Sequence, residues 1–249
     1  MTSPTSVTRA RNAVFIVAEV GSNWRVPAGP GGRETDLDAS WSRTLAMLNV
    51  AAEARVDAVK FQCFAGGDVY APGAGEWHGR DINEVFRDNA LPVEWVQRLA
   101  RECAARDLEF MASVFSLNDV DLVDPYVSRH KIASYELLHL ELLQYAASKG
   151  KPLVISTGAA SAVQVAHAYT AVHGLPAGPT RTWLHCAAAY PAPMEQANVR
   201  ALEGLRGQLG PMEHYGLSDH TLDPVICPVL AVAFGASMIE KHFTLSRGH

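Results

Sequence analysis

The chain has 249 residues, of which 48% are hydrophobic and 19% charged, and its formal net charge at pH 7 is −5. This composition argues against intrinsic disorder and supplies a large core for a chain of this length. There is no basic run and no apolar stretch of about 18 residues, so neither nucleic acid nor membrane is an expected partner. We expect a cytoplasmic protein.

Residues 1–12 lack an apolar signal core and are expected to form a flexible leader before the first strand. Residues 13–249 contain no internal repeat or linker, so they are expected to form one domain. The four cysteines are widely spaced and include no CxxC pair, which argues against a cysteine-rich zinc site. Four reduced thiols are therefore expected.

Eight short apolar runs are the candidate strands. The first is too continuous for a half-exposed strand, which indicates a strand that is buried on both faces. The eight runs lie at residues 14–21, 58–64, 109–115, 130–134, 152–158, 182–187, 215–221 and 237–244.

Helical signals alternate with these runs. Trp41, Leu45, Leu48 and Ala52 recur with helical spacing and predict the first helix. The later helices are expected to begin near Pro92, after Ser116 (a capping box with Asp119), near Leu140, after Ser161 (a capping box with Gln164), after a cap at Asn198, and at Pro224. Residues 65–89 lack clear periodicity and are expected to form a long loop, of the kind that often serves as a functional lid.

Strands that alternate with helices predict a parallel sheet, and eight units predict a closed (β/α)8 TIM barrel of the α/β class. No helical signal follows the last strand, so the expected barrel lacks its last helix. The active site of such barrels lies at the C-terminal ends of the strands. Polar residues gather there, at Glu19, Lys60, Gln62, Ser113, Lys131, Ser134, Ser156, Tyr190, Ser218, His220, Glu240 and His242.

Two histidines end the last two predicted strands. Alternation along a strand places Ser218 with His220 on one face, and Glu240 with His242 on one face. Either histidine alone is as often a satisfied buried residue as a ligand. Two of them at matching strand ends, each beside an acidic residue, indicate a site for a divalent transition metal such as Mn, Fe, Co or Zn.

Two lysines lie within predicted strands, where a charge is costly unless it meets an anion. Lys60 and Lys131, together with the strand-end hydroxyls, indicate an anion cradle that suits a phosphate. We expect the metal on the opposite side of the barrel, where it would polarise a carbonyl. Glu19, Glu136 and Glu240 are candidates for proton transfer. These parts suit a phosphorylated small molecule that condenses with a carbonyl compound.

Several short motifs of the sequence resemble those of the sialic acid synthase (N-acetylneuraminate synthase) family. The motifs occur in the same order as in the family, from about residue 13 to residue 245. The most specific of them are Gly216-Leu217-Ser218-Asp219-His220-Thr221 and Glu240-Lys241-His242-Phe243-Thr244. The resemblance implies a TIM-barrel enzyme that condenses phosphoenolpyruvate with an N-acetylated hexosamine such as N-acetylmannosamine. The product would be a 2-keto-3-deoxy sugar acid, with release of phosphate.

The resemblance also implies roles for the site residues. His220 and His242 would hold the metal, most often Mn²⁺, with Mg²⁺ or Co²⁺ as alternatives, and a homodimer is expected. The catalytic residues would be Glu19, Glu240, Lys60 and Lys131, and the substrate-binding residues would be Gln62, Ser113, Ser134, Glu136, Ser156, Tyr190 and Ser218.

The sequence also departs from the family pattern. Trp24 stands where the family usually has histidine, and Ala188 stands where asparagine is common. The printed sequence ends at His249, before the family's Pro-Gly-Pro-Asp acceptor segment and its antifreeze-like C-terminal domain. The identity of the acceptor is therefore open.

Two other functions compete with the synthase. A Schiff-base aldolase or lyase of a keto acid would use Lys60 or Lys131 as its nucleophile. A non-catalytic relative would bind phosphoenolpyruvate without turnover.

Overall fold

In the computed structural model, which describes residues 14–29, 34–64, 69–77, 79–175 and 180–246, eight parallel strands close into a barrel. Their order around it is β1-β10-β9-β8-β7-β6-β5-β2. The bounds are β1 Phe15–Gly21, β2 Ala58–Cys63, β5 Glu109–Val114, β6 His130–Ile132, β7 Leu153–Ser156, β8 Arg181–Cys186, β9 His214–Asp219 and β10 Met238–His242. The predicted (β/α)8 TIM barrel is confirmed.

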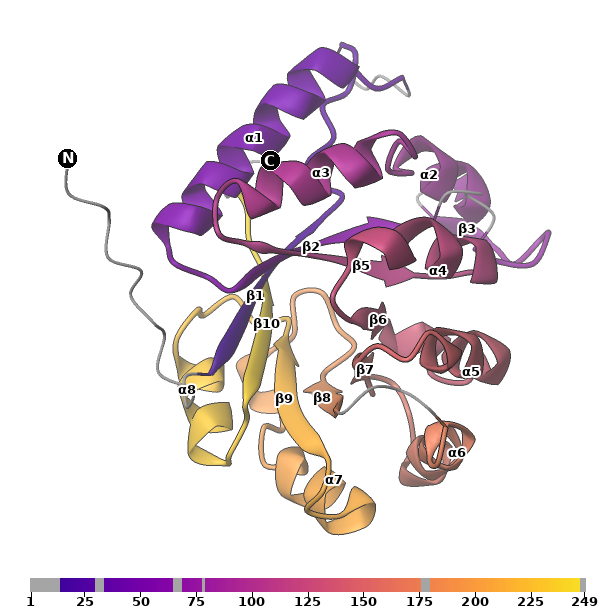
Figure 1. Cartoon of the computed structure of the whole chain (residues 1–249), viewed down its shortest axis with the longest axis vertical. Helices are drawn as coiled ribbons and strands as arrows, with labels where there is room; N and C mark the ends of the chain where they lie inside the picture. The colour runs from indigo at the N-terminus through magenta and orange to yellow at the C-terminus, as the bar shows by residue number, and fades with distance from the viewer. Residues whose placement is uncertain (1–13, 30–33, 65–68, 78, 176–179, 247–249) are drawn as a thin grey trace.

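Helices surround the strands on the outside of the barrel, as Figure 1 shows. They are α1 Leu37–Glu53, α2 Ile82–Asp88, α3 Trp95–Ala104, α4 Leu117–Val123, α5 Leu140–Ser148, α6 Ala162–Val172, α7 Ala201–Leu209 and α8 Ile226–Ala233. Within the described residues, no helix follows β10. None of the described helices is long and apolar enough to span a membrane.

Apolar side chains fill both sides of the strands, which explains why the strand sequences are continuous apolar runs. The main core lies between strands and helices, and a smaller cluster fills the barrel interior. That inner cluster consists of Val17, Ala58, Met111, Val154, Leu184 and Met238. Because these residues occupy the interior below the strand ends, the polar residues further along the strands form the floor of a cavity. All four cysteines are buried and free.

The predicted capping box of Ser161 and Gln164 is confirmed at α6. The one predicted for Ser116 and Asp119 is confirmed in part, because Ser116 accepts a hydrogen bond from the backbone N–H of Asp119 while Asp119 Oδ2 accepts from the backbone N–H of Phe115. The predicted starts of α7 and α8 are wrong. Asn198 does not cap α7, because the helix begins only at Ala201 and Asn198 itself adopts a φ of +43°.

The second error concerns α8, which begins at Ile226 and not at Pro224. Asp223 Oδ1 accepts hydrogen bonds from the backbone N–H groups of Val225 and Ile226, at 2.8 and 2.7 Å, and so satisfies the first turn. Val225 itself has φ −120° and ψ −52°, outside helical geometry, so the helix begins only at the next residue.

The long loop expected at residues 65–89 is partly wrong. Its described part contains α2 and a short antiparallel pair, β3 Glu76–Trp77 with β4 Arg80–Asp81. Asp81 caps α2, and Phe86 of α2 packs edge-on against Phe64 at the end of β2, with ring centroids 5.1 Å apart. This packing holds the excursion against the barrel mouth. Residues 65–68 and 78 lie outside the described ranges, as does the leader expected at residues 1–12.

Trp24, which stands where the resemblance led us to expect histidine, is a core residue. It is 1% exposed and packs edge-on against Trp95 of α3, which in turn contacts Trp41 of α1. The loop after β1 is therefore anchored on α1 and α3 by three indole rings.

We expect Gly216→Ala to destabilise the barrel. A methyl group at Gly216 of β9 would lie 2.6 Å from Leu184 Cδ2 and closer still to the Met238 carbonyl oxygen. Overpacking of this kind costs about 3 kcal/mol of unfolding free energy, which urea denaturation would measure.

The matched control is Gly204→Ala in α7, where an added methyl group meets nothing within 4 Å. This change should stabilise the protein by about 0.5–1 kcal/mol, because alanine favours a helix over glycine. Equal stabilities of the two variants would contradict the packing described here.

Candidate functional site

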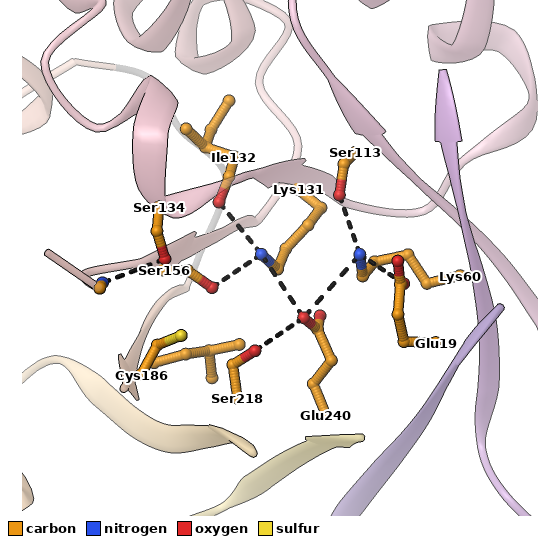
Figure 2. A network of polar contacts seen from close by, with 12 residues as sticks. Glu19, Lys60, Ser113, Lys131, Ile132, Ser134, Ser156, Cys186, Ser218 and Glu240 are labelled. Atoms are coloured by element: carbon orange, nitrogen blue, oxygen red, sulfur yellow. Dashed lines mark hydrogen bonds and ion pairs between the residues drawn. The ribbon is translucent and has the colours of Figure 1, made fainter. Parts of the chain in front are cut away.

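Four buried charged residues form the floor of a cavity at the C-terminal ends of the strands (Figure 2). Lys60 Nζ lies 2.5 Å from Glu19 Oε2 and 3.8 Å from Glu240 Oε1. Lys131 Nζ also lies 3.8 Å from Glu240 Oε1. Glu240 therefore stands between the two ammonium groups and limits their mutual repulsion. Glu240 and His242 lie on β10, which is two strands from β2 with Lys60 and four strands from β6 with Lys131, so the place of the metal relative to the lysines stays a prediction.

Serine hydroxyls surround these charges. Lys60 Nζ donates to Ser113 Oγ at 2.9 Å, and Lys131 Nζ donates to Ser156 Oγ at 2.8 Å. Ser218 Oγ donates to Glu240 Oε1 at 3.0 Å. Each of these serines comes from a different strand, so closure of the barrel brings them to one place.

Ser134 lies on the short helical turn η2 (Ser134–Glu136) that follows β6. Its Oγ accepts a hydrogen bond from the backbone N–H of Gly158 at 3.0 Å. A methyl group at Gly158 would lie 2.8 Å from Ser134 Oγ and 3.0 Å from Cys186 Sγ. Glycine at this position therefore permits the loop after β7 to approach the cavity.

The environment shifts the pKa values of the four charged groups in different directions. Burial raises the pKa of Glu19, despite the opposing effect of Lys60. Burial lowers the pKa of Lys131. Burial alone would lower the pKa of Lys60 and raise that of Glu240, but the opposite charges around each group outweigh it, so the pKa of Lys60 is raised and that of Glu240 is lowered. Glu19 is therefore the carboxyl group most suited to carry a proton.

Apart from Glu19 Oε2, which is ion-paired with Lys60, two buried carboxylate oxygens lack a hydrogen-bond donor among the described residues, Glu19 Oε1 and Glu240 Oε2. A buried oxygen without a donor is unusual, and it indicates a group that is completed by something outside the chain. Both oxygens belong to residues that line the cavity.

His220 and His242 meet at the edge of the same cavity, with ring centroids 5.5 Å apart. His220 Nδ1 donates to the Ala187 carbonyl oxygen at 2.8 Å, and its Nε2 lies 3.8 Å from Cys186 Sγ. Burial, with a contribution from His242, lowers the pKa of His220 to about 4. The surrounding protein and the Lys60 ammonium group lower the pKa of His242 to about 4 as well. Both imidazoles are therefore neutral at pH 7 and able to act as metal ligands.

An ion pair beside the histidines fixes their strand ends. Lys241 Nζ contacts Asp219 Oδ2 and the Thr221 carbonyl oxygen, both at 2.7 Å. Asp219 in turn accepts hydrogen bonds from the backbone N–H and the hydroxyl of Thr221. Because these three residues flank His220 and His242 in sequence, the contacts lock β9 to β10 and set where both rings lie.

The predicted metal ligands are these two rings, and Glu19 lies near them. Glu19 pairs with His242 in the β1–β10 register, and a methyl group at Gly21 would lie 3.7 Å from both Glu19 Oε1 and the His242 ring. No group of three or more His, Cys, Asp or Glu side chains within the described ranges is arranged as a complete ligand set. The donors thus fit an ion that takes two imidazoles and completes its coordination with water or substrate.

The outer wall of the cavity is aromatic. Tyr190 stacks on His220 with ring centroids 3.9 Å apart. Tyr70 and Phe86 from the excursion line the opposite part, together with Phe115 and Tyr135. The cavity has a volume of about 200 Å³.

All thirteen predicted site residues line this one cavity, including Gln62 and Glu136. Burial raises the pKa of Glu136, which lies 3.6 Å from His139. The roles of these residues in binding and catalysis remain predictions. The sequence reasoning missed Tyr70, Phe86, Phe115 and Tyr135. Tyr135 directly follows a predicted site residue, which could have been a signal, whereas residues 65–89 offered no periodicity.

Comparison with known proteins gives the family. The NeuB family model matches residues 47–249. The spore coat polysaccharide biosynthesis protein SpsE of Bacillus subtilis is 33% identical over 240 residues, which cover 94% of this chain and 60% of that protein. The N,N'-diacetyllegionaminic acid synthase of Legionella pneumophila is 31% identical over 245 residues, which cover 94% of this chain and 64% of that protein.

A solved structure agrees. The N-acetylneuraminic acid synthetase of Leptospira borgpetersenii, in complex with citrate, superposes with a TM-score of 0.79 at 28% identity, over 95% of this chain and 75% of that one. The chain spans about three fifths of the length of the two curated relatives above. Because the family model matches most of the chain, and the fold and two relatives agree with it, the chain belongs to the NeuB family of sialic acid synthase-like proteins.

Proposed function

We propose that this protein is a transferase that condenses phosphoenolpyruvate with a sugar aldehyde, such as open-chain N-acetylmannosamine or a related N-acetylated hexosamine. The products are a 2-keto-3-deoxy sugar acid and phosphate. The observation that carries the proposal is the joint presence, in one cavity, of two buried lysines with serine partners and two neutral histidines. The names of relatives, among them pseudaminic acid synthase and N-acetylneuraminate-9-phosphate synthase, support it.

In this proposal, phosphoenolpyruvate binds on the cavity floor. Its phosphate and carboxylate groups accept hydrogen bonds from the ammonium groups of Lys60 and Lys131, which already lie within 3.8 Å of Glu240 Oε1. The hydroxyl groups that surround the lysines supply further donors, from Ser113, Ser134, Ser156 and Ser218. Binding exchanges internal charge partners for the substrate's own charges, which limits the cost of burying it.

The sugar aldehyde binds above this floor. Gln62, Glu136 and Tyr190 contact its hydroxyl groups and ring face, and the aromatic wall excludes water from the reacting atoms. His220 and His242 would hold a divalent ion, most often Mn²⁺, with Mg²⁺ or Co²⁺ as alternatives. When bound, that ion would polarise the aldehyde carbonyl as a Lewis acid.

The bond changes balance as follows. The C2–C3 π electrons of phosphoenolpyruvate form the new bond from C3 to the aldehyde carbon, and the aldehyde oxygen takes a proton to become a hydroxyl group. Water adds at C2 and loses a proton, and the resulting tetrahedral centre collapses to a ketone with loss of phosphate. Glu19, whose pKa burial raises, is the candidate to pass these protons.

One observation favours a second candidate. Burial lowers the pKa of Lys131, and a lysine with a lowered pKa is suited to form a Schiff base with a keto acid. Against this, Lys131 Nζ is occupied by Ser156, the Ile132 carbonyl oxygen and Glu240. The geometry therefore favours an anion-binding lysine over a nucleophilic one.

The homodimer that the resemblance implies is also a proposal. Helix α8 exposes apolar side chains, with Val229 59% exposed and Leu230 45% exposed. Burial of this face against another surface would be favourable.

The direct test is phosphate release from phosphoenolpyruvate with Mn²⁺ and N-acetylmannosamine. We expect release that needs both the sugar and the metal and that stops with a chelator. Metal-independent turnover of a keto acid, with Lys131 trapped by borohydride, would instead establish the aldolase. Tight binding of phosphoenolpyruvate with no release, across a panel of N-acetylated hexosamines, would indicate the non-catalytic relative.

Two substitutions should separate the two halves of the site. Lys131→Met removes a charged donor to phosphoenolpyruvate, so we expect the affinity of the protein for phosphoenolpyruvate to fall about 10- to 100-fold in calorimetric titration.

His220→Ala should weaken Mn²⁺ binding about tenfold or more, while the affinity for phosphoenolpyruvate changes far less. The control is His167→Ala, since His167 lies exposed on α6. A metal affinity unaffected by His220→Ala would contradict the assigned ligand.

A further inference from the structure

A second cavity, of about 290 Å³, is lined by α1 and by the loops after β1 and β10. Its apolar part includes Met47 and Leu245. Its polar part includes Arg25, Arg43 and, in addition, Ser22, Asn23 and Thr244. No carboxylate lines it, although acidic residues outnumber basic ones in the chain, at 26 against 21.

Arg43 is the group that decides what this cavity can bind. Arg43 is half-buried as a residue, and its Nη1 donates to the Arg25 carbonyl oxygen at 3.0 Å. No carboxylate of the described residues forms an ion pair with it. The neighbours of Arg43 on the same face of α1 are Ala39, Ser40, Ala46 and Met47, none of which carries a charge. This contrasts with Lys60 and Lys131, whose charges are balanced inside the protein.

The walls of the cavity are fixed before any ligand arrives. Asn23 Nδ2 donates to the Phe243 carbonyl oxygen at 3.0 Å, which ties the loop after β1 to the loop after β10. The backbone N–H of Val26 donates to Ser40 Oγ at 2.8 Å, which ties the same loop to α1. Arg25 Nε donates to Thr35 Oγ1 at 2.8 Å. Donors that are already held in place bind a ligand more tightly, because little conformational freedom is lost on binding.

We propose that this second cavity binds a phosphate or carboxylate group, with Arg43 as its principal charged donor. A half-buried arginine without an anionic partner is costly, and its planar fork matches both kinds of oxyanion. The hydroxyl group of Ser22 completes the donor set. Thr244 Oγ1, by contrast, already donates to the Ser246 carbonyl oxygen at 3.0 Å and accepts from the Ser246 backbone N–H at 3.4 Å.

Both loops that line the second cavity are close in sequence to residues of the first cavity. Ser22 follows Glu19 by three residues and Thr244 follows His242 by two. The oxyanion could therefore come from two sources, an anionic substituent on the acceptor sugar or a separate anion. The first source rests on the proposed synthase function, whereas oxyanion binding itself does not.

Calorimetric titration with inorganic phosphate tests the binding. We expect two sites in the unaltered protein, of which Lys131→Met removes one and Arg43→Gln weakens the other about tenfold or more. Ser22→Ala should weaken that same site by a smaller factor, and it serves as the second variant because it leaves the Arg43 hydrogen bond to the loop intact. Arg200→Gln, on an exposed residue far from both cavities in sequence, is the charge-matched control. Identical titrations for the unaltered protein and Arg43→Gln, with the variant folded, would overturn the proposal.

The two sources separate in steady-state kinetics with N-acetylmannosamine and its 6-phosphate. If the acceptor carries the anion, Arg43→Gln lowers the ratio of kcat/KM for the phosphorylated over the neutral sugar about tenfold. If the titration depends on Arg43 but this ratio does not, the ligand is a separate oxyanion. A protein that fails to turn over either sugar still gives the titration, so failure of the synthase proposal is distinguishable from failure of this one.

Discussion

The structure of the site depends on one carboxylate placed between two buried ammonium groups. Glu240 Oε1 lies 3.8 Å from both Lys60 and Lys131 and accepts a hydrogen bond from Ser218. Two positive charges this deep in a barrel would repel one another and lose their hydration, at a cost of several kcal/mol for each ion. With Glu240 and Glu19 the ligand-free floor is close to neutral, yet its ammonium groups remain able to exchange partners for an anionic substrate.

The barrel makes this arrangement possible because parallel strands bring residues that are distant in sequence to one edge. Glu19 and Glu240 come from the two ends of the chain, and Lys60 and Lys131 come from its middle. The histidines depend on the same geometry, reinforced locally by the Lys241–Asp219 ion pair. In the proposed reaction, the lysines hold the phosphorylated substrate while the histidines serve the aldehyde, so one cavity can bring the two reacting carbons together.

The alternation of strands with helices was sufficient to predict the barrel. The alternation of side chains along each strand was sufficient to predict which polar residues near the strand ends face inward. Pairing of His220 with His242 could be predicted for the same reason, and both line the cavity. The contacts between residues could not be predicted, since they depend on strand register. Glu240 was expected near the metal and not as the bridge between the lysines. Trp24 shows a second limit of prediction from the sequence. Its departure from the expected histidine was visible, but its burial against Trp95 could not be predicted, because it depends on how the loop after β1 packs on α3.

The most direct test of this account is the unfolding free energy of Glu240→Gln, measured by urea denaturation with and without phosphoenolpyruvate. Loss of the bridging charge leaves the lysines underpaired, so the ligand-free variant should lose about 3–5 kcal/mol. Saturating phosphoenolpyruvate should then stabilise the variant by more than it stabilises the unaltered protein, because the ligand supplies the missing negative charge. An equal effect of phosphoenolpyruvate on both proteins, or no effect on either, would contradict the claim that these charges form an anion cradle.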